Sequence, residues 1–192
     1  MVSEEDPADA LARLSLAESI PCSKPAAKPP RNAYDHMITI VITDAGDCKF
    51  QVYHGVLCFY LEYFKKLLDG PFKEGGSTCH VLNDVTFDVF LMFYSRMNTG
   101  TVMDSLESAD ADLSSEDLVR LYVFADFYMA EQLKNRILEL FFMQMLKDWA
   151  ISTPVTSLVY DKTTQISLLR KLHFDVCIET SGLANLRDQA QN

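Results

Sequence analysis

Basic residues are scarce in this sequence of 192 residues. Its 17 lysines and arginines stand against 27 aspartates and glutamates, which gives a formal net charge of −10. Attraction to a nucleic-acid backbone depends on clustered positive charge, so this balance opposes direct binding of nucleic acid. The basic cluster at residues 24–31 is interrupted by prolines and is typical of a solvated linker.

Long hydrophobic runs are also missing. The most apolar stretch, residues 137–146, contains Glu139 and Gln144 and is shorter than the roughly 20 residues that cross a bilayer as a helix. The first 16 residues are acidic and lack the basic start and apolar core of a secretory signal. The sequence therefore predicts an intracellular protein, cytoplasmic or nuclear, without a membrane span.

The cysteine patterns of a disulfide framework or a zinc finger are absent. The 5 cysteines are scattered and include no C-x-x-C pair, which is typical of reduced, small apolar residues. The adjacent Cys79 and His80 would point to opposite sides of a strand, where they cannot share a metal. No G-x-S-x-G, P-loop or H-E-x-x-H motif occurs. We therefore expect no metal site, no cofactor and no enzymatic activity.

What is present is a mixed pattern of strands and helices. Residues 1–33 are acidic and proline-rich, which predicts a disordered leader. Alternating apolar residues then predict a β-hairpin over residues 38–52, a helix over residues 56–68, a short strand at 79–82 and a helix over 86–97. This order favours an α+β fold.

The second half of the sequence is predicted to be helical. An acidic loop at residues 103–117 precedes a helical pattern that ends near residue 129, and Ser114 with Asp117 resembles a capping box at its start. A further helix begins near Glu131, and two smaller helical patterns follow at 155–160 and 167–177. The predicted divisions are a domain at 34–141, a C-terminal helical extension at 142–180 and a flexible tail at 181–192.

Several short motifs, in this order, resemble the BTB/POZ family. They are FQVYHGVLC at 50–58, GPFKE at 70–74, Thr99-Gly100 and, most specific, LVRLYVFADFYMAEQLKN at 118–135. The tail at 159–172 is similar to the extension of fungal BTB proteins that carry no second recognisable domain. The resemblance implies a short β-sheet packed on a cluster of α-helices, and a module that binds other proteins and associates with itself.

The resemblance also implies particular contact residues. In family members that act as substrate adaptors, a Phe-x-Glu and an Ala-Asp-x-Tyr segment face a cullin scaffold, and these correspond here to Phe72, Glu74, Asp126 and Tyr128. An apolar anchor beside a carboxylate and a phenol is a plausible binding hot spot. The alternative is that Phe72 packs on its own domain and Tyr128 belongs to the core.

Dimerisation in the family uses the first helix and the strand before it. In this sequence that surface would include Val56, Phe59 and Tyr60. A large aromatic at Phe59 marks an interface if it is exposed, although a wide buried stripe explains it equally well.

Two functional readings therefore follow from the sequence. In the first, the protein is a homodimerising adaptor that engages a cullin-type ubiquitin ligase scaffold. In the second, it is a transcription-associated regulator that acts through a protein partner. The repressor branch of the family relies on a buried Asp and a charged groove, and Met37 and Tyr53 stand where those features are expected.

Overall fold

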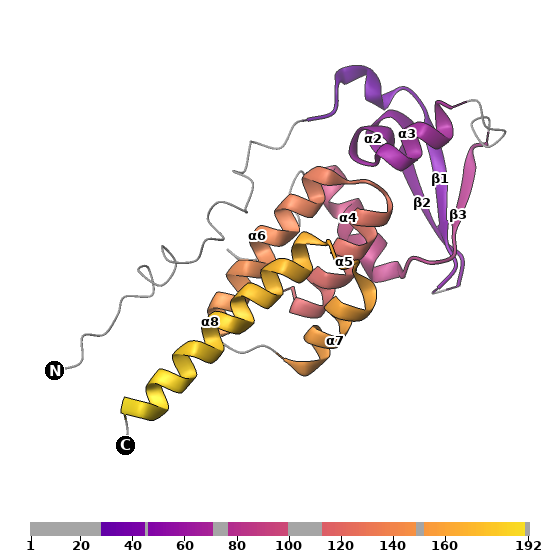
Figure 1. Ribbon diagram of the computed structural model, residues 1–192. Helices are drawn as coiled ribbons and strands as arrows, with labels where there is room; N and C mark the ends of the chain where they lie inside the picture. The colour runs from indigo at the N-terminus through magenta and orange to yellow at the C-terminus, as the bar shows by residue number, and fades with distance from the viewer. Residues whose placement is uncertain (1–27, 45, 71–76, 100–112, 149–151, 191–192) are drawn as a thin grey trace.

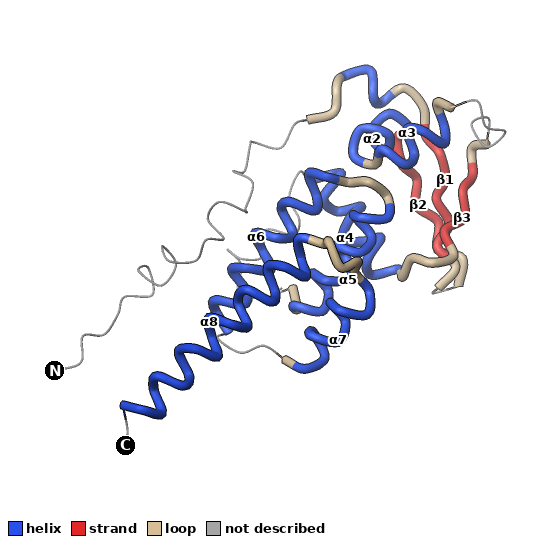
Figure 2. Tube along the Cα trace, in the orientation of Figure 1, coloured by secondary structure: helices blue, strands red, loops and turns tan. Residues whose placement is uncertain are grey.

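The computed structural model describes residues 28–44, 46–70, 77–99, 113–148 and 152–190. Figure 1 shows a small sheet at one end of the molecule, with helices α2 and α3 beside it and the remaining helices forming the larger body. Figure 2 separates the strands from this helical body by colour. The described residues thus confirm the predicted α+β class, with a small sheet packed on a helical cluster.

The sheet contains three strands in the order β2-β1-β3. β1 (Met37–Ile42) pairs antiparallel with β2 (Cys48–Tyr53) and parallel with β3 (Cys79–Leu82). The turn between β1 and β2 contains Gly46 at φ 85° and Asp47 at φ 53°. Glycine adopts this left-handed conformation without steric cost, which suits it to the tight turn. The predicted hairpin and the predicted third strand are both present.

Two short helices connect β2 to β3 where the sequence pattern predicts one. α2 (His54–Tyr60) and α3 (Glu62–Leu68) are separated by Leu61, whose backbone is extended at φ −119° and ψ 104°. The prediction of a continuous helix over residues 56–68 is therefore wrong. The break turns the chain while Leu61 stays fully buried, and Glu62 then lies in the first turn of α3, where a negative charge is favourable.

A close backbone approach fixes the start of α2 against the preceding segment. The 3₁₀ helix η2 (Arg31–Tyr34) packs on α2, and its Ala33 is buried. A Cβ atom on Gly55 would lie 2.6 Å from Ala33 Cα and 2.8 Å from Ala33 O. Only glycine fits at position 55 without moving η2.

The helical body begins with α4 (Phe87–Thr99), α5 (Ser115–Phe127) and α6 (Glu131–Asp148). The Ser114 side chain accepts a hydrogen bond of 3.1 Å from the Asp117 backbone N–H, which confirms the predicted cap of α5. Residues 100–112, which hold most of the predicted acidic loop, lie outside the described residues. Glu116 and Asp117 belong to the first turn of α5 and not to that loop.

The last two helices, α7 (Thr153–Lys162) and α8 (Leu168–Ala190), pack against the body. Val159 and Leu169 are fully buried in the same hydrophobic cluster as Leu57 and Phe90. α8 also continues past residue 180, where a flexible tail is predicted. Within the described residues, no helix is both long and apolar enough to span a membrane.

Candidate functional site

The C-terminal end of α5 brings together two of the residues that the sequence selects. Tyr128 caps this helix and is only 5% exposed. Its ring contacts those of Phe64 and Phe124, and its backbone oxygen accepts a hydrogen bond of 3.3 Å from the Tyr63 N–H. Burial raises the pKa of Tyr128 to about 12, so its hydroxyl stays neutral. Tyr128 is a core residue with one edge at the surface.

Asp126 lies on the exposed side of the same helix end. Its carboxylate Oδ1 is 2.6 Å from Lys134 Nζ on α6, and Glu131 also contacts that ammonium group. Burial lowers the pKa of Lys134, but the hydrogen bond to Asp126 and the negative charge of Asp126 have the larger combined effect. The pKa of Lys134 is therefore raised. Asp126 therefore already has a partner within the chain. Phe72 and Glu74, the other two predicted contact residues, lie outside the described residues.

An apolar groove of about 400 Å³ opens beside Tyr128. It runs between the segment that follows β3, the exposed face of α5 and the end of α7. The residues that line it are Asp84, Val85, Thr86, Val89, Arg120, Val123, Phe124, Phe127, Tyr128, Leu158 and Lys162. Charged groups thus stand among mainly hydrophobic walls, a composition that suits an amphipathic partner segment.

Phe127 is the groove residue that sequence reasoning missed. It is 61% exposed, although its ring contacts Tyr63 at 6.1 Å and Tyr128 at 4.9 Å between centroids. A usable signal is present in the sequence, because Phe127 falls off the helical stripe that Leu121, Phe124 and Tyr128 define. A large aromatic outside that stripe is expected at the surface. Here its ring packs against the buried Tyr128 and the half-buried Tyr63.

The residues predicted for a dimer interface are less exposed than expected. Val56 is buried at 5% exposure, and Phe59 and Tyr60 are half-buried with ring centroids 5.1 Å apart. Burial raises the pKa of Tyr60, and although Arg96 opposes this shift, nearby Tyr34 adds to it. Val56 therefore belongs to the core and not to the outer face.

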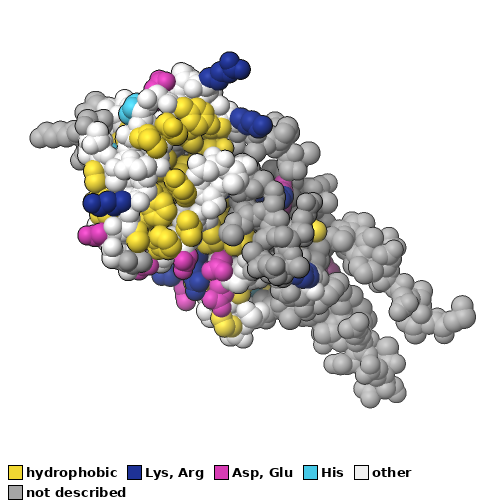
Figure 3. All heavy atoms as spheres, turned by 180° about the vertical axis from the view of Figure 1, so that it is seen from behind, with side chains coloured by type: hydrophobic (Ala, Val, Ile, Leu, Met, Phe, Trp, Pro, Cys, Tyr) yellow, Lys and Arg dark blue, Asp and Glu magenta, His cyan; other side chains and the backbone are white. Residues whose placement is uncertain are grey.

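More exposed apolar residues lie just beside this position. Tyr34, Met37 and Tyr53 are 49%, 47% and 37% exposed. Met37 and Tyr53 are partners across the β1 and β2 ladder, and the Tyr34 ring meets that of Tyr53 edge-on at 5.2 Å. We call these three residues the Tyr53 cluster. Hydrophobic side chains also gather on the face of the molecule that Figure 3 shows.

A cluster of three polar side chains near the start of α2 was not predicted. His54 and Cys58 on α2 and Asp69 at the end of α3 place three potential metal-ligand atoms within 4.8 Å of one another. Burial is the main cause that lowers the pKa of His54, and burial with the charge of Asp69 raises that of Cys58 to about 11. The available signal was the spacing of His54 and Cys58, which puts both on one helical face.

The Cys79 and His80 side chains do point to opposite sides of β3, as predicted. Cys79 is exposed, whereas His80 is 9% exposed and its Nε2 lies 3.0 Å from the Ser77 carbonyl oxygen. These two residues do not form a common site.

Comparison with protein families identifies the domain. The family model described as "BTB/POZ domain" matches residues 32–141, which is more than half of the chain. No curated protein matches the chain. The matched region ends within α6, so α7 and α8 lie beyond it.

Proposed function

Because the chain belongs to the BTB/POZ family, whose domain is a protein–protein interaction module and not an enzyme family, we propose that it is an adaptor for a cullin-type ubiquitin ligase scaffold. The single observation that carries this proposal is Phe127, exposed at 61% beside an apolar groove. The choice of a cullin as the scaffold rests on the resemblance of residues 70–74 and 118–135 to cullin-binding members of the family.

The arrangement of rings around Phe127 suits a protein contact. Exposed aromatic residues on a preorganised base lose little conformational entropy when a partner covers them. Tyr63 and Tyr128 provide such a base, since both contact the Phe127 ring and Tyr128 is fixed in the core. Binding hot spots are enriched in large side chains at packed positions of this kind. We therefore assign the scaffold contact to the end of α5, which carries Asp126, and to the groove beside it.

Replacement of Phe127 by alanine is expected to weaken scaffold binding without unfolding the protein. Loss of a hot-spot aromatic costs about 2 kcal/mol of binding free energy or more, which corresponds to a roughly 30-fold increase in Kd. Titration calorimetry of the full chain with a purified cullin N-terminal domain measures this change. Phe72→Ala and Glu74→Ala are expected to weaken the same complex.

The matched control is Phe174→Ala. Phe174 lies on α8 with 53% exposure, so its loss removes a similar exposed ring far along the chain from the groove. It is expected to leave the Kd unchanged. A Kd of Phe127→Ala equal to that of the wild type would contradict the assignment. An equal increase of the Kd in Phe127→Ala and Phe174→Ala would contradict it as well. If the wild-type chain forms no complex with a cullin domain, the adaptor proposal itself is wrong.

The second part of the proposal is that two copies associate through the Tyr53 cluster. Tyr53 lies on the strand directly before the first helix, the region that the family uses for dimerisation, and Met37 and Tyr34 contact it from β1 and η2. Contiguous exposed apolar side chains of this kind favour a protein contact. A second copy of the chain covers the cluster most simply, because an isologous interface pairs the same surface on both partners.

Light scattering at tens of micromolar protein tests the dimer. We expect a mass twice that of the 21.7 kDa chain. Tyr53→Glu places a charge in the centre of the interface and is expected to give the monomer mass. Val81→Glu is the control, because Val81 is 53% exposed on β3, across the sheet from β2. A monomeric wild type, or equal effects of both substitutions, would show that the Tyr53 cluster does not hold two copies together.

A further inference from the structure

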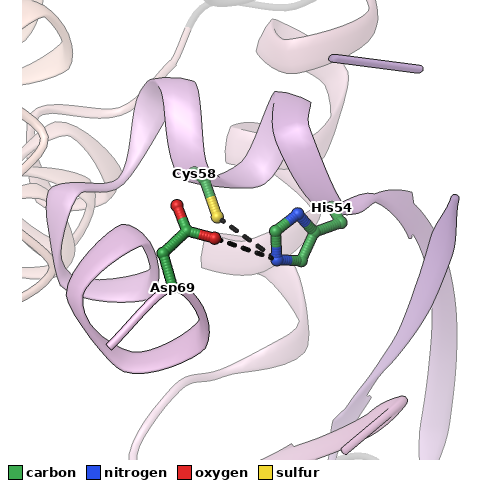
Figure 4. A group of neighbouring side chains, drawn as sticks. All are labelled: His54, Cys58 and Asp69. Carbon is green, nitrogen blue, oxygen red and sulfur yellow. Dashed lines mark hydrogen bonds and ion pairs between the residues drawn. The ribbon is translucent and has the colours of Figure 1, made fainter. Parts of the chain in front are cut away.

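His54, Cys58 and Asp69 converge on one point. Figure 4 shows the Cys58 thiol and the Asp69 carboxylate directed at the same ring nitrogen of His54. Cys58 Sγ lies 3.9 Å from His54 Nε2, and Asp69 Oδ1 lies 3.7 Å from that same atom. His54 begins α2, Cys58 follows one turn later, and Asp69 caps α3. The break at Leu61 folds the two helices together so that these three groups meet.

The distances are close to those of a tetrahedral metal site. Zinc binds sulfur at about 2.3 Å and nitrogen or oxygen at about 2.0–2.2 Å, which places neighbouring ligand atoms roughly 3.4–3.6 Å apart. The two separations that share His54 Nε2, 3.9 Å and 3.7 Å, exceed these values by a few tenths of an ångström, and all three ligand atoms lie within 4.8 Å of one another. Closing the three groups onto an ion requires side-chain rotation, for which Asp69 has room because its side chain is 54% exposed.

We propose that His54, Cys58 and Asp69 form a zinc site that joins the start of α2 to the end of α3. The thiolate and imidazole select a borderline-soft transition metal over magnesium or calcium. A thiolate and a carboxylate together neutralise the two charges of Zn²⁺, so the bound site carries no net charge. Three protein ligands leave the fourth tetrahedral position for water or for a group of a partner.

The surroundings hold the histidine in place. The His36 ring stacks on that of His54 at 4.4 Å between centroids, and the backbone N–H of His54 donates a hydrogen bond of 2.9 Å to the His36 carbonyl oxygen. The tight contact of Gly55 with Ala33 fixes the segment that carries His36. The stacked His36 ring therefore packs against the imidazole from outside the ligand set, and the backbone bond fixes the start of α2 that carries it.

The three ligand groups differ in exposure. Cys58 is buried at 8% exposure, while the Asp69 side chain is 54% exposed. A metal ion enters past the carboxylate and reaches the sheltered thiol. Binding breaks the S–H bond of Cys58 and forms the Zn–S bond, and the proton passes to solvent; no electron is transferred. The reaction therefore needs only the ion, neutral imidazole and ionised carboxylate.

The chain contains its own matched control for this geometry. His173 and Cys177 on α8 have the same spacing as His54 and Cys58, with Cys177 Sγ 3.6 Å from His173 Nδ1. Within the described residues, no third ligand group joins them. If a histidine and a cysteine one helical turn apart were sufficient, both pairs would bind zinc equally.

Cobalt titration of the reduced full chain, freed of metal by a chelator, tests the site. We expect one Co²⁺ per chain, with the thiolate-to-cobalt charge-transfer absorption of a tetrahedral site, and displacement by Zn²⁺. Cys58→Ser is expected to abolish that absorption. Asp69→Asn is expected to weaken the affinity at least 10-fold, since the loss of even an outer partner of a metal ligand costs about 10–100-fold. Cys177→Ser is expected to change neither property.

The outcomes separate the proposal from its rivals. No stoichiometric binding by the wild type, or a charge-transfer band that persists in Cys58→Ser and disappears in Cys177→Ser, would overturn it. If Cys58→Ser does not fold, Asp69→Asn decides the question, because its exposed side chain can change without a cavity, and an unchanged affinity in that variant would exclude Asp69 as a ligand. Cobalt binding is measured without a scaffold, so its outcome does not depend on whether the proposed adaptor function holds.

Discussion

Replacement of Phe90 by alanine is expected to lower the free energy of unfolding by about 3–5 kcal/mol, the usual cost of removing a buried phenylalanine. Phe90 is fully buried on α4. Its ring contacts Phe50 on β2 at 4.8 Å, Phe93 at 6.0 Å and Phe124 on α5 at 6.4 Å. The substitution leaves a cavity between the sheet and the helical body, so both parts lose packing. Urea denaturation followed by circular dichroism measures the change.

The neighbouring residue on α4 is the control. Leu91 is 40% exposed, so Leu91→Ala is expected to change the free energy of unfolding by no more than about 0.5 kcal/mol. A change of less than about 1 kcal/mol in Phe90→Ala would mean that the site collapses around the missing ring, or that the sheet and helices do not share one core.

Leu169→Asp is expected to have a comparably large effect, and it probes the C-terminal helices. Leu169 is fully buried on α8 within the main hydrophobic cluster. An uncompensated carboxylate at such a position costs about 3–5 kcal/mol. α8 packs on α6 and α7, and α7 packs on α5, so we expect both terminal helices to loosen. A smaller denaturant slope would accompany the loss of stability, because less surface is then exposed on unfolding.

Ile166→Asp provides the comparison for this substitution. Ile166 lies between α7 and α8 and is 93% exposed, so a charge there remains in water. Its effect on stability is expected to stay within about 0.5 kcal/mol. Equal stabilities of the two variants would contradict the packing of α7 and α8 as part of the folded domain. Unequal stabilities would place the extension beyond residue 141 within the cooperative unit.

Much of the fold could be predicted from local pattern. The β-branched residues of β1, the strand at β3 and the Ser114 cap follow from short-range preferences that tertiary contacts reinforce. The break at Leu61 could not be found in this way. Leu57, Leu61 and Phe64 keep helical spacing in the sequence, and all three are buried. Leu61 nevertheless has an extended backbone, which separates α2 from α3. Only the position of the core shows that the chain must turn there.

The functional residues were predicted less completely, for a similar reason. A helical stripe indicates which residues are buried, and Tyr128 follows it into the core. The stripe does not indicate which exposed residue has a groove beside it, because the groove at Phe127 depends on α7, far along the chain. The same limit applies to Asp69, which meets His54 only because α2 and α3 fold together. Phe72 and Glu74 stay predictions.

The strand order β2-β1-β3 has a consequence for folding during synthesis on the ribosome. β1 and β2 are joined by a short turn and close locally, whereas the parallel partner β3 follows α2 and α3 in the chain. Synthesis proceeds from the N-terminus, so one edge of β1 stays unpaired until residues 79–82 have left the ribosome. That edge belongs to the strand with the fully buried Ile40 and Ile42. We therefore expect a nascent-chain chaperone to bind β1 in preference to the other two strands.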